Sequence, residues 1–203
     1  MKLSALAPLF VLCGLCASTA APGAGTADEG QSKSTACIAC HGPNGNSVNP
    51  EWPNLAGQHE QYVVKQLQAF KNGARKNPLM TPMAMGLSDD DMEDLGAYFA
   101  TQKPAGLEAD AAKLPLGQRV YRSGDLKSGV PACSACHGPT GAGNPTANYP
   151  LLRGQYATYV AAQLRNYRAN NRQTDANKVM RDVASTMTDE QIDAVASYVQ
   201  GLR

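Results

Sequence analysis

One short pattern occurs twice in this 203-residue chain and constrains it more than any other feature. The sequence reads Cys-x-x-Cys-His at residues 37–41 and again at residues 133–137. Two thiols about one helical turn apart are placed to form thioethers with the two vinyl groups of a haem, and the histidine that follows offers imidazole to the iron. The pattern therefore predicts two covalently bound haem c groups. The predicted attachment residues are Cys37, Cys40, Cys133 and Cys136, and the predicted iron ligands are His41 and His137.

Two other readings of the cysteine pairs need a different context. A redox dithiol of the thioredoxin type is expected beside a βαβ pattern, and the sequence shows none. A zinc site built from both pairs would have a tetrahedral set of four sulfurs. It would leave His41 and His137 without a role, so haem attachment is the favoured interpretation.

The first 21 residues predict an export signal that is removed from the mature protein. They contain a lysine, an apolar run over residues 3–16 and then small residues up to Ala21. The apolar run is too short for a typical membrane-spanning helix. Cys13 and Cys16 fall inside it, so the four remaining cysteines all belong to the haem motifs. The predicted compartment is a bacterial periplasm.

An internal repeat sets the domain organisation. Residues 36–43 match residues 132–139 with a shift of 96, and with one insertion residues 52–58 match residues 149–155. The predicted divisions are a signal peptide at 1–21, a first domain at 22–100, a linker at 101–115 and a second domain at 116–203. The linker carries two prolines and has no long apolar period.

Within each copy the periodicity is helical. One amphipathic helix is predicted over residues 58–72 and its counterpart over 155–169. The last helix of each copy is predicted to begin after a capping residue, Ser88 in the first and Thr188 in the second. Because no convincing alternating strand run is present, the predicted fold class is all-α, with two tandem domains that each wrap around one haem. Inward-facing positions are predicted at Leu95, Tyr98, Phe99, Val195, Tyr198 and Val199.

The sixth ligand of each iron is predicted from the repeat. The methionine candidates in the first half are Met80, Met83, Met85 and Met92. Counting back from the matched starts of the last helices pairs Met80 with Met180, whereas the other three pair with Val183, Ser185 and Ile192. The axial pairs are therefore predicted as His41/Met80 and His137/Met180, with each methionine in an irregular loop before the last helix. Met83 is the alternative in the first half.

A histidine–methionine pair suits electron transfer. The soft thioether raises the reduction potential, and a filled sixth position excludes peroxide or oxygen. The predicted function is a one-electron carrier and not an enzyme. The alternatives that stay open are a dihaem enzyme such as a peroxidase, and a fixed electron-input subunit of a membrane complex. The remaining histidine, His59, is expected to be a solvated residue at the start of a surface helix.

The whole mature chain resembles the dihaem cytochrome c4 family. The residues that carry the resemblance are the two CxxCH motifs with Gly-Pro after each, the Pro-x-Leu-x-Gly-Gln segments and the methionine loops. The resemblance implies two class I cytochrome c domains that face each other with their haem propionate edges close together. It also implies a periplasmic carrier, often associated with the membrane, that delivers electrons to a terminal haem-copper oxidase. A quinol-oxidising cytochrome complex or another carrier is the implied donor.

Charge is unequal between the two halves. Residues 28–102 carry five Lys and Arg against nine Asp and Glu, whereas residues 104–203 carry eleven against eight. The acidic run at residues 89–94 is explained by a helix N-terminus, which favours negative charge. The hypothesis for the second half is a basic surface that steers docking on an acidic partner, and a solvated face without a partner stays open as the alternative. Nucleic acid is not a credible partner for an exported chain with a net charge of +1. The basic surface is predicted from Arg165, Arg168, Arg172, Lys178 and Arg181.

Overall fold

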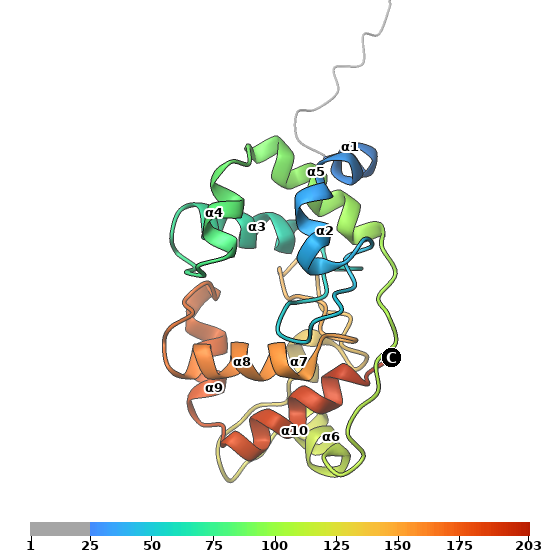
Figure 1. Cartoon of the computed structure of the whole chain (residues 1–203). Coiled ribbons are helices and arrows are strands. Elements are labelled where there is room, and N and C mark those ends of the chain that lie inside the picture. The colour runs from blue at the N-terminus through green and yellow to red at the C-terminus, as the bar shows by residue number, and fades with distance from the viewer. Residues whose placement is uncertain (1–24) are drawn as a thin grey trace, which may run out of the picture.

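The computed structural model describes residues 25–203 and shows two helical domains that lie one above the other (Figure 1). The first domain contains α1 (Ala27–Lys33), α2 (Thr35–His41), α3 (Glu60–Lys71), α4 (Met80–Met85) and α5 (Asp89–Thr101). The second contains α6 (Leu114–Ser123), α7 (Ser134–His137), α8 (Ala157–Arg168), the 3-10 turn η1 (Ala176–Lys178), α9 (Val179–Ser185) and α10 (Asp189–Gln200). The predicted signal peptide at residues 1–21 lies outside the described residues.

The all-α prediction is confirmed for the described part of the chain. Its only β-type pairings are two isolated bridges, Asp125 with Val130 and Asn144 with Tyr149. No helix between residues 25 and 203 combines the length and the apolar character needed to cross a membrane. The fold is therefore built from packed helices and the loops between them.

The two long C-terminal helices begin where the sequence predicts. Ser88 accepts a hydrogen bond from the backbone N–H of Asp91, and the Asp91 side chain accepts one from the Ser88 backbone. Thr188 and Gln191 form the same capping box before α10. Helices α3 and α8 start two residues later than predicted, because the backbone of His59 is extended before α3 and that of Tyr156 is not yet helical before α8.

Each domain packs its first helix closely against its last. Helix α1 crosses α5 at Gly30, where a Cβ atom would lie 1.9 Å from the carbonyl oxygen of Asp94. Helix α6 crosses α10 at Gly117, where a Cβ would lie 2.2 Å from the carbonyl oxygen of Ala194. Any larger residue at either glycine would push the two helices apart, so the crossing depends on a missing side chain.

The apolar cores are small and centre on the C-terminal helices. In the first domain Leu95, Tyr98 and Phe99 are buried, with Cys37 packed against them. In the second domain the core includes Val195, Tyr198 and Val199, with Cys133 at its edge. All six predicted inward-facing positions are thus confirmed as buried. Domains of this size bury limited apolar surface by themselves, and each core ends at a cysteine of a CxxCH motif.

The segment between α5 and α6 runs along the outside of both domains (Figure 1). The Asn46 side chain donates a hydrogen bond to the Lys103 carbonyl and accepts one from the backbone N–H of Ala105. Further along, the backbone N–H of Asp110 donates to the Ser197 hydroxyl. The connection is therefore fastened to both domains, while the exact domain boundaries stay a prediction.

Candidate functional site

The cysteines of each motif lie on or beside a short helix. Cys37 and Cys40 are on α2, and Cys133 immediately precedes α7, which holds Cys136. Residues three apart on a helix share a face, so Cys37 and Cys40 lie on one face of α2. All four carry free thiols. Before haem attachment, burial raises the pKa of the Cys37 thiol, and it raises the pKa of the Cys133 thiol to about 11.

Each motif histidine is buried and held in one orientation. His41 Nδ1 lies 2.8 Å from the carbonyl oxygen of Pro53, and His137 Nδ1 lies 3.1 Å from that of Pro150. A carbonyl oxygen only accepts, so Nδ1 carries the proton and Nε2 keeps its lone pair. Burial also lowers the pKa of both rings, which favours the neutral form that binds metal. The geometry leaves the Nε2 lone pair of each ring available to bind a metal ion.

The two predicted methionine ligands lie in the first turns of short helices and not in irregular loops. Met80 is the first residue of α4, and Met180 is the second residue of α9. The loop prediction was wrong at this point because Asn77 Oδ1 accepts hydrogen bonds from the backbone N–H groups of Leu79 and Met80, both at 2.9 Å. Those bonds satisfy the first donors of α4 and start the helix.

The other methionines of the first domain are placed differently. Met83 and Met85 are exposed at 46% and 64%, and Met92 is completely buried in the core. Met80 and Met180 are both partly buried. Helix α4 packs against α3, and α9 packs against α8. This arrangement favours Met80 over Met83, and methionine ligation remains a prediction.

Comparisons with known proteins agree with this geometry. Residues 27–103 and 116–203 each match the family model for cytochrome c. The chain is 48% identical to cytochrome c4 of Thiocapsa roseopersicina over 90% of this chain and 96% of that protein. It is 46% identical to cytochrome c4 of Azotobacter vinelandii over 88% and 90% of the two chains. The chain belongs to the cytochrome c4 family.

A solved structure supports the same assignment. The crystal structure of reduced recombinant cytochrome c4 from Pseudomonas stutzeri is 45% identical, has a TM-score of 0.86, and matches 89% of this chain and 100% of that one. As a cytochrome c4 this chain is an electron-transfer protein that binds two haem c groups. The free thiol pairs and the neutral histidines with open Nε2 atoms fit that cofactor. Among residues 25–203 no three His, Cys, Asp or Glu side chains are grouped as a zinc site requires.

The interface between the two cytochrome c4 domains is built from reciprocal hydrogen bonds. Gln58 of the first domain accepts from the backbone N–H of Leu151 at 2.9 Å and donates to its carbonyl at 3.0 Å. Gln155 of the second domain accepts from the backbone N–H of Asn54 and donates to its carbonyl, both at 2.8 Å. Each glutamine thus holds both backbone groups of one residue in the other domain.

The residues that follow these glutamines also bond across the interface. His59 Nε2 lies 2.9 Å from the carbonyl oxygen of Ala142, and the Tyr156 hydroxyl donates to the carbonyl of Ser47 at 2.5 Å. The prediction that His59 is solvated was wrong, because the start of α3 abuts the other domain. Sequence periodicity describes one helix and carries no information about what lies against its first turn.

A third contact uses two arginines, Arg75 and Arg172, whose interdomain role the sequence reasoning missed. Arg75 donates to Tyr159 and Gln163 of the second domain, and Arg172 donates to Tyr62 and Gln66 of the first, all between 2.8 and 3.0 Å. Each arginine also donates to the glutamine of its own domain. The available signal was their separation of 97 residues, which equals the separation of the two tyrosines and of the two glutamines. We call the residues joined by these hydrogen bonds the arginine cluster. Its members are Arg75, Arg172, Gln66, Gln163, Tyr62 and Tyr159.

The arginine cluster contains no carboxylate. Arg172 is only 5% exposed, yet its partners are amide and hydroxyl oxygens. Burial alone would raise the pKa of Tyr159, but the nearby charges of Arg75 and Arg172 lower it below its usual value. The cluster therefore joins the domains by charge-assisted hydrogen bonds, which are stronger than neutral ones.

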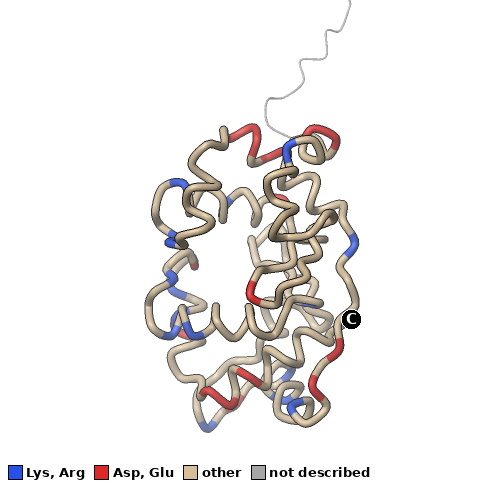
Figure 2. Tube along the Cα trace, viewed as in Figure 1, with Lys and Arg blue, Asp and Glu red and all other residues tan. Residues whose placement is uncertain are grey.

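The basic surface predicted on the second domain is wrong for four of its five residues, and of these five Lys178 alone is exposed without an ion pair among the described residues. Arg165 pairs with Asp189 and Asp193, Arg168 pairs with Asp189, and Arg181 pairs with Asp175. Arg172 is buried in the arginine cluster. Figure 2 shows Lys and Arg next to Asp and Glu in this domain. Counting charges along the sequence overestimated the free positive charge because helix neighbours neutralise it.

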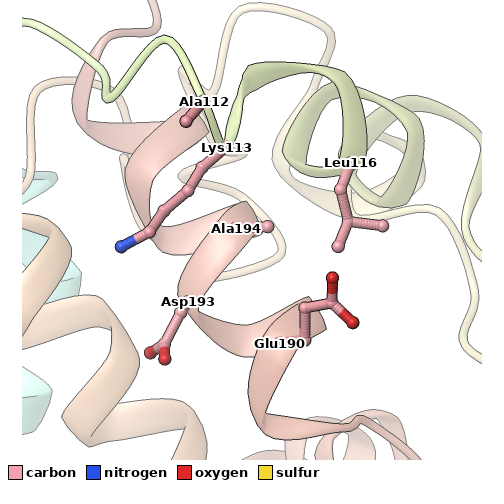
Figure 3. Close-up of a pocket in the computed structure, with 6 residues that line it drawn as sticks. All are labelled: Ala112, Lys113, Leu116, Glu190, Asp193 and Ala194. Carbon is pink, nitrogen blue, oxygen red and sulfur yellow. The ribbon is translucent and has the colours of Figure 1, made fainter.

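A pocket of about 210 Å³ lies on the second domain between α6 and α10 (Figure 3). Lys113 and Asp193 border it, and Leu116 supplies its apolar side. None of the eight predicted haem residues lines it. It is therefore separate from the haem sites.

Proposed function

We propose that each domain holds one haem c through the residues predicted from the sequence. In the first domain Cys37 and Cys40 form the thioethers, and His41 and Met80 are the axial ligands. In the second domain Cys133 and Cys136 form the thioethers, and His137 and Met180 are the axial ligands. The observation that carries the proposal is that both buried histidines have Nδ1 committed to a proline carbonyl, which leaves Nε2 for iron.

When bound, the haem supplies a reversible one-electron iron couple. The residues of the chain set how that couple behaves. The histidines are fixed by their hydrogen bonds, so the ligand geometry has little freedom to change when an electron arrives. A methionine thioether favours the ferrous state and raises the reduction potential. A site with both axial positions filled by protein suits a carrier.

We further propose that the protein works in the periplasm and delivers electrons to a terminal haem-copper oxidase. Membership of the cytochrome c4 family and the export signal predicted at residues 1–21 support this proposal. A variant that lacks residues 1–21 should remain inside the cell without attached haem. The full chain should be recovered from the periplasmic fraction with two haems.

The proposed electron acceptor, a terminal oxidase, is tested with purified protein and oxidase-containing membranes. Reduced protein should be reoxidised by the membranes in a reaction that cyanide blocks. Reoxidation that persists with cyanide, or no reoxidation at any protein concentration, would contradict the proposed acceptor. Washing the source membranes with salt separates a mobile carrier, which is released, from a fixed subunit, which is retained.

A further inference from the structure

The hydrogen bond that orients each axial histidine is the start of a chain that ends in the other domain. His41 Nδ1 donates to the Pro53 carbonyl. The Pro53 carbonyl and the Asn54 N–H belong to the same peptide group, and that N–H donates to Gln155 Oε1 at 2.8 Å. Gln155 lies in the second domain. One peptide group therefore separates the histidine of the first domain from a glutamine of the second.

The mirror arrangement is present at the second haem site. His137 Nδ1 donates to the Pro150 carbonyl. The Leu151 N–H of that same peptide group donates to Gln58 Oε1 at 2.9 Å. Gln58 lies in the first domain, so the two chains of hydrogen bonds cross the interface in opposite directions.

The histidines and glutamines at the ends of these hydrogen-bond chains are buried. Gln58 and Asn54 are each 6% exposed, Gln155 is 9% exposed, and both histidines are 6% exposed. In such low-dielectric surroundings connected hydrogen bonds polarise one another. An acceptor on the peptide N–H makes the carbonyl of that peptide more negative. The carbonyl then draws more strongly on the histidine Nδ1–H and makes Nε2 a more basic ligand.

We propose that Gln155 tunes the haem of the first domain and that Gln58 tunes the haem of the second. They are positioning residues that act on the reduction potential through a peptide group and a histidine. A more basic imidazole stabilises ferric iron, so each glutamine lowers the potential of the haem in the opposite domain. This inference rests on the proposed axial role of His41 and His137.

The test is a crossed pair of substitutions. Gln155→Met removes the side-chain oxygen that accepts from the Asn54 N–H, with little change in side-chain volume. Gln58→Met does the same for the oxygen that accepts from the Leu151 N–H. Redox titrations followed haem by haem with NMR should show that Gln155→Met raises the potential of the first haem and leaves the second nearly unchanged. Gln58→Met should show the reverse. The expected shift is about threefold in the ratio of oxidised to reduced haem, or roughly 30 mV on the scale of 59 mV per tenfold for one electron.

Matched controls break neighbouring bonds across the same interface without touching the histidine chain. Tyr156→Phe removes the bond to Ser47, and His59→Phe removes the bond to Ala142. Both control variants should leave the reduction potentials of the two haems unchanged. Equal shifts in the controls and the glutamine variants, or a shift in the glutamine's own domain, would overturn the proposal.

A measurement on the unaltered protein covers the case in which the variants do not fold. In the fully reduced protein, a scalar coupling through the hydrogen bond should connect the Asn54 amide nitrogen with the Gln155 side-chain carbonyl carbon. Its absence would overturn the proposal. The two proposals fail in different ways. If the proposed ligation is wrong, the unaltered protein has other haem ligands. If this inference is wrong, the ligands are as proposed and the glutamine variants show no shift in reduction potential.

Discussion

The two domains use matching residues at much of their interface and differ along the short helices that carry the predicted methionine ligands. Gln58 and Gln155 make the same pair of bonds, as do Arg75 and Arg172. The short helices that carry the predicted methionine ligands, α4 and α9, diverge instead. Residues 77–88 of the first domain carry no charge and expose Leu79 and Met85, whereas residues 178–185 carry Lys178, Arg181 and Asp182.

This contrast shows which contacts the symmetry constrains. At an interface with approximate twofold symmetry, corresponding residues meet corresponding surroundings, which favours matching residues such as Gln58 and Gln155. Helices α4 and α9 pack on α3 and α8 of their own domains. Their exposed residues differ in charge and polarity, so the two domains present different surfaces beside the predicted methionine ligands.

The largest expected effect comes from removing a methionine ligand. Met80→Ala should open the sixth position of the first haem, and Met180→Ala should open that of the second. Each variant should bind carbon monoxide at one haem only, and the potential of that haem should fall because the soft thioether is lost. Carbon monoxide titration of the reduced variants measures this. A Met80→Ala protein that binds no carbon monoxide would show that another residue is the ligand.

The exposed methionines of α4 provide the control for that experiment. Met83→Val and Met85→Ser give the first domain the residues of the second. Because both side chains are exposed, unfolding free energy should change by less than about 0.5 kcal/mol and carbon monoxide should not bind. Carbon monoxide binding in Met83→Val would make Met83 the ligand.

Substitutions in the arginine cluster should have the next largest effect, and the two arginines should differ in how much each stabilises the protein. Arg172 is almost completely buried, whereas Arg75 is half-buried. Losing charge-assisted hydrogen bonds in a buried site costs more, so Arg172→Leu should lower the unfolding free energy by about 2 kcal/mol and Arg75→Leu by about 1 kcal/mol. Denaturant unfolding followed by circular dichroism measures both. Equal or reversed losses would contradict the difference in burial.

Much of each single domain could be predicted from the sequence, because its signals are local. The haem motifs, the capping boxes at Ser88 and Thr188 and the buried faces of α5 and α10 follow from spacing within a few residues. The roles of His59, Gln58 and Gln155 were not predictable in this way, since their partners lie 83 to 101 residues away. The ion pairs of Arg165 and Arg168 were also missed, because they join α8 to α10, whose residues lie 21 to 28 positions further along the chain.

The smallest expected effect concerns pH and the first domain. Lys33 on α1 pairs with Asp91 and Asp94 on α5 and holds the pKa of both carboxyls below the usual 3.8. The counterpart of Asp91 in the second domain is the uncharged Gln191. A carboxyl with a lowered folded-state pKa stabilises the fold above pH 3.8, and that contribution is lost as the pH falls further.

Lys33→Met tests this pair. The variant should be slightly less stable than the unaltered protein at neutral pH, because the charges are partly exposed and screened. The gap between the two proteins should narrow as the pH falls below 3.8. Thermal unfolding at a series of pH values measures it, and a gap that widens in acid would contradict the assigned pairing.

The most direct test of the account is a haem count combined with a carbon monoxide difference spectrum of the fully reduced, unaltered protein. The account predicts two covalent haems per chain and no carbon monoxide binding, because His41/Met80 and His137/Met180 fill both axial positions. Binding at either haem would show an open site. That result would contradict the proposal that both domains hold their iron through a histidine and a methionine.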